Sequence, residues 1–373
     1  MSYKADITII GAGVVGLAIA SEVARDGRSV YILEKNESFG REQSSRNSQT
    51  IHAGIYFEKD FLKTKFCTEA NPLMYEICKR EGIPHHKCGK INISTNAAEE
   101  VALTTFYDRA RDIGTEARWM SQKEIKSLEP ELHAIRAFLT PSTGVLDTYA
   151  LMKYFLERGR RKGVQIAYKS LVTGIEGADK GYNIRIENQD GEFTFHTRIL
   201  INSAGLFSDH IAALAGIDIE KEKYKIHYLK GDYFTVAGPK NKSIKHLIYP
   251  IPSDVNFGAH VCLDPDMRLR IGPFGYRVDA IDYKVFSIEP QRLMETAIMR
   301  ALPFLEPADL EPETAGMMAN IQRPFETPRD FIIRHEIDKG LPGFIDLVGM
   351  DSPALTCSPV IGKYIAGMVD EIY

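Results

Sequence analysis

The sequence predicts an α/β protein in which a largely parallel sheet is combined with a second, mainly antiparallel α+β domain. Residues 5–10, 14–26 and 29–34 have the patterns of a buried strand, a helix and a second strand, which together make the βαβ unit of a parallel sheet. Residues from 344 onward repeat a strand, turn and helix pattern. Residues 224–275 differ, because they contain strand-like segments rich in Tyr, Ile, Val and Phe that Gly and Pro interrupt.

The other expected elements follow from the same hydrophobic patterns. The turn at 188–191 (NQDG) predicts a hairpin, and Ser121 with Glu124 has the spacing of a helix capping box. Strands are expected at 164–168, 171–176, 182–187, 192–196, 198–203 and 344–348, and helices at 62–81, 96–112, 208–215 and from about 353.

Two domains are expected, because a chain of 373 residues exceeds what one hydrophobic core usually supports. The strand, turn and helix patterns occur at both ends of the chain, whereas the antiparallel block lies in the middle. The domains are therefore expected to be interleaved. The first is predicted to comprise 1–85, 140–215 and 325–373, and the second 86–139 and 216–324.

Composition and charge exclude several classes of protein. Hydrophobic residues make up 44% and charged residues 26% of the chain, which argues against disorder. A net charge of -4 without a stripe of Lys and Arg argues against a nucleic-acid partner. Five cysteines without a C-x-x-C pair argue against disulfides and a metal site, and favour a reducing, cytoplasmic location. No transmembrane segment is predicted, while peripheral contact with a membrane remains open.

A glycine-rich motif follows the first predicted strand and opens the first predicted helix. Gly11 permits a tight turn, Gly13 allows the backbone to approach a pyrophosphate, and Gly16 allows close packing of helix and strand. Val15 lies within this motif, at the helix N-terminus that would face the phosphates. Glu34 ends the second strand, where a carboxylate can accept ribose hydroxyls and repel a 2′-phosphate. These residues predict a dinucleotide site that disfavours NADP, and leave NAD and FAD open.

Further segments narrow the choice of cofactor. They are SSRNSQTIHAGIYF (44–57), CGKINIST (88–95), PSTGVLDTYAL (141–151), INSAGLFSDHIAALAG (201–216), KGDYF (230–234), YPIP (249–252), RIGPFGY (270–276) and SPALT (352–356). In this order they resemble the D-amino-acid oxidase superfamily of FAD-dependent oxidoreductases, and within it the L-2-hydroxyglutarate dehydrogenase or oxidase family. The resemblance extends over nearly the full chain.

The resemblance implies a glutathione-reductase-type Rossmann FAD domain with an inserted, mainly antiparallel substrate domain, and FAD as the cofactor. It also implies that the C-terminal helix begins near Ser352 and directs its free N–H groups at the flavin, which favours the negative charge of the reduced ring. The positions expected to contact FAD are Gly11, Gly13, Val15, Gly16, Glu34, Lys35, Ser44, Ser45, Asn47, Val172, Ala204, Gly205, Gly349, Ser352 and Leu355.

The implied reaction is oxidation of a small 2-hydroxy acid, with L-2-hydroxyglutarate to 2-oxoglutarate as the first candidate, by hydride transfer to flavin N5. Such chemistry needs a base, for which His52 is the candidate, although a structural role remains open. Tyr56 and Tyr249 are candidates to orient a carboxylate, or else core aromatic residues. Lys230 is a candidate cation for the anionic substrate or the flavin.

One motif departs from the family pattern. Relatives usually have Gly, then Ile or Val, then Arg, where this chain reads Ala319-Asn320-Ile321-Gln322-Arg323. A gap-free alignment places Gln322 at the arginine position, and Gln cannot give the charged, bidentate contact of Arg with a carboxylate. A slip of one residue would supply Arg323, on the opposite face of a strand. Arg323, Lys230 or Arg277 are candidates to compensate.

Other functions remain open at this point. An amino-acid or glycine oxidase and a glycerol-3-phosphate-type dehydrogenase use related chemistry, a flavin-binding module would lack turnover, and an NAD dehydrogenase would use the glycine motif alone. The expected partners are a small anionic substrate and an electron acceptor, which is oxygen, a quinone or another flavoprotein.

Overall fold

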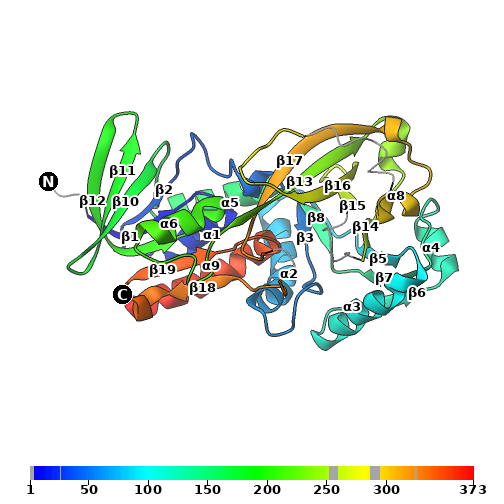
Figure 1. Ribbon diagram of the computed structural model, residues 1–373, viewed down its shortest axis with the longest axis horizontal. Coiled ribbons are helices and arrows are strands. Elements are labelled where there is room, and N and C mark those ends of the chain that lie inside the picture. Colours follow the sequence, from blue (N-terminus) through cyan, green and yellow to red (C-terminus); the bar gives the residue numbers. More distant parts are fainter. Residues whose placement is uncertain (1–3, 26, 252–258, 286–294, 324–325) are drawn as a thin grey trace. The chain divides into compact units, whose positions relative to one another are not determined.

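The computed structural model describes residues 4–25, 27–251, 259–285, 295–323 and 326–373 (Figure 1). The chain divides into two compact units, each built from separate stretches of sequence. The first unit consists of Met1–Ser45, Thr148–His227 and Ala319–Tyr373, and the second of Arg46–Asp147 and Tyr228–Met318. The two units are interleaved along the sequence.

The first unit contains an eight-stranded mixed sheet with the order β10-β11-β12-β1-β2-β9, to which β19 is added beside β12 and β18 beside β19. Strand β1 runs parallel to both β2 and β12, and β12 runs parallel to β19, which confirms the predicted parallel sheet. The strands are β1 (Lys4–Ile10), β2 (Val30–Leu33), β9 (Gln165–Ala167), β10 (Leu171–Ala178), β11 (Gly181–Asn188), β12 (Gly191–Asn202), β18 (Ile332–His335) and β19 (Phe344–Val348).

The hairpin at 188–191 is confirmed, but the two strands expected after it are one. Strand β12 continues through Thr197 because no Gly or Pro interrupts it, and the Thr8 hydroxyl donates to the buried Thr197 hydroxyl at 2.9 Å. Its first part pairs antiparallel with β11, and its second part pairs parallel with β1. A single strand thus joins the hairpin to the parallel sheet.

Helices cover this sheet. Almost every residue of α1 is buried, and α1 packs against both α5 and α9 (Figure 1). The Arg158 guanidinium on α5 pairs with the Glu22 carboxylate at the end of α1. The helices are α1 (Val14–Val23), α5 (Thr148–Arg160), α6 (Ser208–Leu214) and α9 (Ala354–Ile372).

The second unit contains an eight-stranded sheet with the order β17-β13-β16-β15-β14-β5-β7-β6. Neighbours from β13 to β14 and from β5 to β6 are antiparallel, whereas β14 and β5 are parallel. The mainly antiparallel domain is thereby confirmed. The strands are β5 (Lys90–Ser94), β6 (Arg118–Met120), β7 (Arg136–Thr140), β13 (His227–Val236), β14 (Leu247–Pro250), β15 (His260–Leu263), β16 (Leu269–Arg277) and β17 (Leu310–Asn320).

Four helices and a small sheet complete the second unit. Helix α2 has the predicted bounds, and the capping box of Ser121 and Glu124 is confirmed at the start of α4. The small sheet has the order β3-β8-β4. These elements are α2 (Leu62–Glu81), α3 (Glu100–Asp112), α4 (Gln122–Leu128), α8 (Ala297–Ala301), β3 (Thr50–Ile51), β4 (His85–His86) and β8 (Gly144–Leu146).

The compact units differ from the expected domains in their bounds. Residues 46–85 were expected in the nucleotide-binding domain, but they belong to the second unit. Strands β3 and β4 pair with β8 at residues 144–146, which were also expected in the first domain, and Ala53 and Ile55 pack in one hydrophobic cluster with Leu103 and Phe138 of the second unit. Short strands of two or three residues carry too little pattern to reveal this pairing in the sequence.

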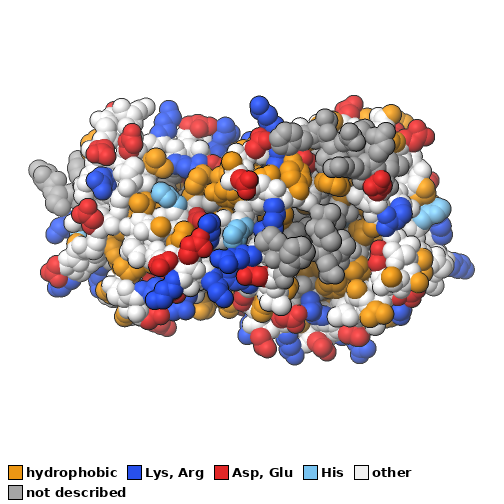
Figure 2. Space-filling view, in the orientation of Figure 1, with side chains coloured by type: hydrophobic (Ala, Val, Ile, Leu, Met, Phe, Trp, Pro, Cys, Tyr) orange, Lys and Arg blue, Asp and Glu red, His pale blue; other side chains and the backbone are white. Residues whose placement is uncertain are grey.

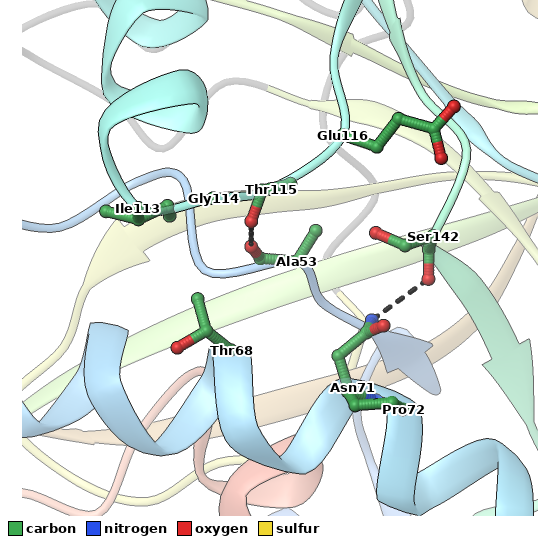
Figure 3. Close-up of a pocket in the computed structure, with 9 residues that line it drawn as sticks. All are labelled: Ala53, Thr68, Asn71, Pro72, Ile113, Gly114, Thr115, Glu116 and Ser142. Carbon is green, nitrogen blue, oxygen red and sulfur yellow. Dashed lines mark hydrogen bonds between the residues drawn. The ribbon is translucent and has the colours of Figure 1, made fainter.

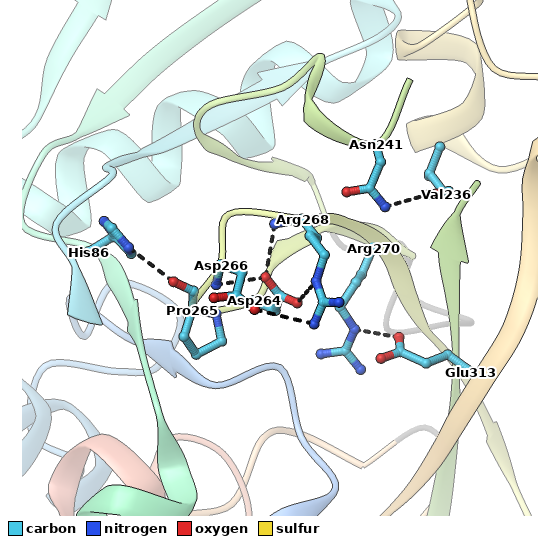
Figure 4. Close-up of polar contacts among 9 residues, drawn as sticks. All are labelled: His86, Val236, Asn241, Asp264, Pro265, Asp266, Arg268, Arg270 and Glu313. Carbon is cyan, nitrogen blue, oxygen red and sulfur yellow. Dashed lines mark hydrogen bonds and ion pairs between the residues drawn. The ribbon is translucent and has the colours of Figure 1, made fainter. Parts of the chain in front are cut away.

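Ion pairs fix the hairpin between β15 and β16 in the second unit (Figure 4). Asp264 accepts from the Arg268 Nε at 2.6 Å, and the nearly buried Arg270 donates its Nε to Glu313 of β17 at 2.6 Å. His86 contacts the Pro265 carbonyl at 3.0 Å through its Nε2. These contacts are structural and hold neighbouring strands together.

Charged side chains of both signs are interspersed on the face drawn in Figure 2. Within the described ranges, no helix is long and apolar enough to cross a membrane. The five cysteines are all free.

Candidate active site

The turn after β1 can be formed only by glycine at two positions. Gly11 has φ +102°, and a Cβ atom there would lie 2.6 Å from the Ser203 carbonyl oxygen. A Cβ atom at Gly16 would lie 2.1 Å from the Gly11 carbonyl oxygen. The chain therefore passes close to α1 and the end of β12, and leaves the partly exposed backbone of Gly11 and Gly13 at the helix N-terminus. This arrangement suits a pyrophosphate group.

Glu34 organises this turn. Its buried carboxylate accepts a hydrogen bond from the Ala12 N–H at 2.8 Å through Oε2, and from the Asn36 N–H at 2.9 Å through Oε1. The next residue, Lys35, pairs with the Glu42 carboxylate and lies over the Phe207 ring at 4.7 Å. Contact of Glu34 with a ribose remains a prediction, and Lys35 has a partner within the protein.

The polar segment after β2 is fastened to the turn. The buried Ser44 hydroxyl accepts from the Val14 N–H at 3.0 Å, whereas Ser45 is exposed and its hydroxyl donates to the Glu42 carbonyl at 3.3 Å. The Gln43 amide donates to the Met350 carbonyl at 2.7 Å and accepts from the Ala319 N–H at 3.2 Å. Sequence reasoning missed Gln43, because only the fold brings its partners together.

The turn after β12 is stabilised through Asn202 by a buried acid, Asp346. Asn202 accepts from the Ala204 N–H at 3.1 Å, and its amide donates to the Ser208 carbonyl and to the Asp346 Oδ1, each at 2.7 Å. Asp346 is fully buried on β19, and this burial raises the pKa of its carboxyl well above the usual range. Asp346 thus orients the amide that fixes the partly exposed Ala204 and Gly205. The sequence could have indicated Asp346, because an acidic residue is unusual within a strand that is otherwise apolar.

The remaining predicted cofactor positions are distributed over both units. Gly349 has φ +72°, and a Cβ atom there would lie 3.0 Å from the Ile321 side chain. Helix α9 begins at Ala354, close to the expected Ser352, and Leu355 lies in its first turn. Val172 is buried on β10. Asn47 differs, because it belongs to the second unit, where its side chain accepts from the Gln49 N–H at 2.8 Å.

The second unit gathers a cluster of aromatic and basic side chains, which we call the His52 cluster. It contains three predicted residues and two that the sequence did not reveal, Lys90 and His260. The Tyr56 and Tyr249 rings stack with centroids 6.2 Å apart, and the Tyr249 and His260 centroids lie 3.7 Å apart. The members of the His52 cluster are His52, Tyr56, Lys90, Tyr249 and His260.

Burial controls the protonation of the His52 cluster. It lowers the pKa of His52 to about 3, with smaller effects from nearby Lys90 and His260, so the imidazole is neutral at physiological pH. It also lowers the pKa of Lys90 to about 7 and raises the pKa values of Tyr56 and Tyr249, which stay protonated. His52 as a residue is only partly buried, and its neutral imidazole can accept a proton from a neighbouring group.

Tyr56 and Tyr249 differ in how their hydroxyl groups are used. The Tyr56 hydroxyl donates to Asn92 Oδ1 at 3.1 Å and accepts from Lys90 Nζ at 2.9 Å. Its hydrogen is therefore committed within the protein, as expected for a core aromatic residue. The Tyr249 hydroxyl has a longer contact of 3.4 Å with the Thr50 hydroxyl. Tyr249 is the better placed of the two to donate to a carboxylate.

The candidate cations for the substrate have partners elsewhere. Lys230 is fully buried in the second unit, lies 3.9 Å from Asp232 and 3.4 Å from Asp282, and donates to the Lys284 carbonyl. Arg323 is exposed in the first unit and pairs with Glu220 at 3.3 Å. Arg277 is an exposed residue at the end of β16.

Gln322 is placed differently from the expectation. Strand β17 ends at Asn320, so Gln322 lies beyond the strand and the alternation of strand faces does not apply to it or to Arg323. The Gln322 amide donates to the Glu326 carbonyl at 2.6 Å, and its backbone N–H donates to Asn320 at 3.0 Å. Gln322 thereby stabilises its own turn in the first unit. Pro324, which follows Arg323, lies outside the described residues.

A cavity of about 270 Å³ is lined by Ala53, the residue after His52, and by residues of α2 and of the segment after α3 (Figure 3). The Asn71 amide in its lining donates to the Ser142 carbonyl at 2.9 Å and to the His52 carbonyl at 2.8 Å. The Thr115 hydroxyl donates to the Ala53 carbonyl at 2.8 Å. These bonds fix the backbone of the segment that carries His52.

The described residues include no group of three or more His, Cys, Asp or Glu side chains that could hold a metal ion. The glycine turn, by contrast, provides unhindered backbone at a helix N-terminus, which fits a dinucleotide. A family model described as FAD dependent oxidoreductase, DAO, matches residues 6–368. The chain belongs to the DAO family of FAD-dependent oxidoreductases. This DAO-family chain is therefore an oxidoreductase, and FAD is its cofactor.

Curated relatives of this DAO-family chain include three that are named L-2-hydroxyglutarate dehydrogenase. The Arabidopsis thaliana protein, named as mitochondrial, is 31% identical over 97% of this chain and 83% of its own length. The Caenorhabditis elegans protein, also named as mitochondrial, is 32% identical over 79% of this chain and 69% of its own length. The Escherichia coli K12 protein is 27% identical over 98% of this chain and 93% of its own length.

Solved structures have the same DAO-family fold. An L-alpha-glycerophosphate oxidase from Mycoplasma pneumoniae with FAD bound has a TM-score of 0.84 at 23% identity, covering 99% of this chain and 95% of that one. A glycine oxidase from Geobacillus kaustophilus has a TM-score of 0.78 at 20% identity, covering 100% and 96%. At these identities the likeness shows the fold alone.

Substitution of Asp346 is expected to weaken FAD binding in this DAO-family chain. Asp346→Leu removes the acceptor of the Asn202 amide, so the turn at Ala204 loses its support, and the Kd for FAD should rise roughly five- to tenfold, the value of about one hydrogen bond. Asp346→Asn keeps an acceptor and should bind FAD nearly as the parent does. Titration of the apoprotein with FAD, followed by flavin fluorescence, measures both. Equal loss in the two variants would contradict this role.

Proposed function

We propose that this chain is an FAD-dependent dehydrogenase or oxidase of a small 2-hydroxy acid, with L-2-hydroxyglutarate oxidised to 2-oxoglutarate as the reaction. The observation that carries the proposal is a neutral, partly exposed His52 in a cluster with a buried lysine and two tyrosines. A neutral imidazole suits removal of a hydroxyl proton, and the cation suits an anionic substrate. The names of the curated relatives support the choice of L-2-hydroxyglutarate.

In this proposal, His52 Nδ1 or Nε2 accepts the proton of the substrate C2 hydroxyl group. The hydrogen bonds from Asn71 to the backbone on either side of the cavity hold the segment that carries His52 in position. Tyr249 donates its hydroxyl hydrogen to a substrate carboxylate, whereas Tyr56 keeps its hydrogen on Asn92. Bound FAD supplies the acceptor for the C2 hydride at N5. Gly11, Gly16, Glu34 and Ser44 would hold this cofactor through the turn that they form.

This chain has Gln322 at the position of the arginine that relatives use for the substrate carboxylate, and we propose that neither Gln322 nor Arg323 replaces that arginine. Gln322 stabilises a turn and Arg323 pairs with Glu220. For the same reason we leave Lys230, which has two acidic neighbours, outside the substrate site. We also propose a reducing, cytoplasmic location, which the free cysteines support.

The test is the visible spectrum of the purified protein before and after anaerobic addition of L-2-hydroxyglutarate. Bleaching of the flavin bands would support the proposal, and no electron acceptor is needed for this step. D-2-hydroxyglutarate, glycine and glycerol-3-phosphate serve as controls, because the first has the opposite configuration and the others are substrates of related chemistry. Bleaching by glycine or glycerol-3-phosphate alone would replace the proposed substrate, and a yellow protein that none of them reduces would refute it.

A further inference from the structure

Lys90 is a fully buried lysine at the start of β5. Its Nζ donates to the Tyr56 hydroxyl at 2.9 Å and lies over two rings, 4.2 Å from the centroid of Tyr56 and 4.7 Å from that of Tyr249. Among the residues that the structure describes, Lys90 forms no ion pair with a carboxylate. Among the described residues, its positive charge is offset by a hydroxyl, by aromatic faces and by the nearby Cys67 thiol.

In the part of the chain that the structure describes, the groups that face Lys90 come from several elements, and none of them is a carboxylate. The loop after β3 contributes His52 and Tyr56, β14 contributes Tyr249, and α2 contributes the Cys67 thiol. On β7, the Thr140 hydroxyl donates to the Lys90 backbone carbonyl at 3.2 Å. His260 belongs to the same cluster through its contact with Tyr249.

Lys230 provides a comparison within the same unit. Both lysines are fully buried, but Lys230 has Asp232 and Asp282 as partners. A buried charge destabilises the folded protein unless it is paired with an opposite charge. The charge of Lys90 beside the candidate base His52 therefore lowers the stability of the fold. This contrast indicates that the charge of Lys90 attracts an anion that binds near the His52 cluster from outside the protein.

We infer that Lys90 is a positioning residue that gives the His52 cluster its preference for carboxylate-bearing substrates, in place of the motif arginine at whose position this chain has Gln322. This inference rests on the proposed function and names how the same site recognises its substrate. Because Lys90 is shielded from solvent, it acts across the tyrosine rings and through the Tyr56 hydroxyl, not by contact with the substrate. The same charge disfavours protonation of His52.

The experiment uses glutarate, which has both carboxylates of the proposed substrate but no hydroxyl group to oxidise. Glutarate binding to the FAD-loaded protein is followed by the change in flavin absorbance at about pH 6 and about pH 9. Burial lowers the pKa of Lys90 to about 7, so the lysine is charged at the lower pH and neutral at the higher one. We expect glutarate to bind roughly tenfold more tightly at the lower pH.

Two variants isolate the contribution of Lys90. Lys90→Met, which keeps an unbranched side chain but removes the charge, should lose roughly tenfold in glutarate affinity at the lower pH and should show no difference between the two pH values. Lys79→Met removes an exposed lysine from the end of α2 in the same unit and should behave as the parent does. Lys90→Met should raise the KM for the 2-hydroxy acid more than it lowers kcat.

The outcomes separate this inference from the proposed function. Oxidation of L-2-hydroxyglutarate with unchanged glutarate binding in Lys90→Met would overturn the role of Lys90 and leave the proposed function standing. Glutarate binding with the expected pH dependence but without oxidation of L-2-hydroxyglutarate would support Lys90 and refute the proposed substrate. If Lys90→Met fails to fold, glutarate binding to the parent protein still tests the inference. Equal glutarate affinity of the parent at both pH values would overturn it.

Discussion

Gly16→Ala is expected to yield a protein that cannot retain FAD. The new Cβ atom would lie 2.1 Å from the Gly11 carbonyl oxygen and 2.6 Å from the Ser203 hydroxyl. The first of these is backbone, so the turn itself must move, and with it the N-terminus of α1 that suits the pyrophosphate. A distortion of about 3 kcal/mol corresponds to about a hundredfold increase in the Kd for FAD. The ratio of flavin to protein after purification, followed by titration with FAD, measures the effect.

Gly367→Ala is the matched control for this substitution. Gly367 lies in α9 of the same unit, and a Cβ atom there would meet no atom within 4 Å. This variant should bind FAD as the parent does and unfold at the same or a slightly higher temperature, because alanine favours a helix over glycine. Stoichiometric FAD in purified Gly16→Ala would show that the glycine turn is not the cofactor site.

His52→Asn is expected to keep FAD and to lose most of the reaction rate. Asparagine retains a polar side chain but cannot take up a proton, so flavin reduction by the 2-hydroxy acid should slow by about 10²- to 10⁴-fold. Glutarate binding should change much less, because Lys90 and Tyr249 remain. Anaerobic stopped-flow measurement of flavin reduction separates the rate from binding. His133→Asn, at an exposed position in the same unit, is the control.

The pH profile gives an independent check on His52. A base acts only in its unprotonated form, and burial lowers the pKa of His52 to about 3. The parent kcat/KM should therefore show no acidic limb from His52 between about pH 5 and pH 8, in contrast to an exposed histidine. A rate that falls with a midpoint near the ordinary histidine pKa, together with a full rate in His52→Asn, would assign the proton to another group.

The nucleotide-binding features could be predicted because they are local in the sequence. Gly11, Gly16 and Glu34 lie within one βαβ unit, where each glycine and the acid follow from the geometry of a single turn. The FAD cofactor is confirmed by the family match. Helix α2 and strand β19 were predicted with the bounds that the structure has, since continuous hydrophobic patterns mark them.

The His52 cluster could be predicted only in part, because it depends on pairing between distant strands. Strand β14 runs parallel to β5, and this pairing brings Tyr249 over Lys90. Both lysines are fully buried, but among the described residues only Lys230 has carboxylate partners, Asp232 and Asp282. Nothing in the local sequence distinguishes Lys90 from Lys230 in this respect. The local sequence also does not mark the end of β17 at Asn320. The expectation that Gln322 and Arg323 lie on opposite faces of a strand was therefore wrong.

The order of assembly follows from the contact between α1 and α9. Helix α1 leaves the ribosome before its packing partner α9, because α1 spans Val14–Val23 and α9 spans Ala354–Ile372. Strand β1 likewise has no pairing partner on one side until β12 has been synthesised, and β12 has none on its other side until β19 has been synthesised. During translation the first unit therefore cannot close around its cofactor until α9 has been synthesised, and the hydrophobic segments made earlier must remain protected until then. Ribosome stalling or truncation before α9 should therefore leave a nascent chain that depends on chaperones.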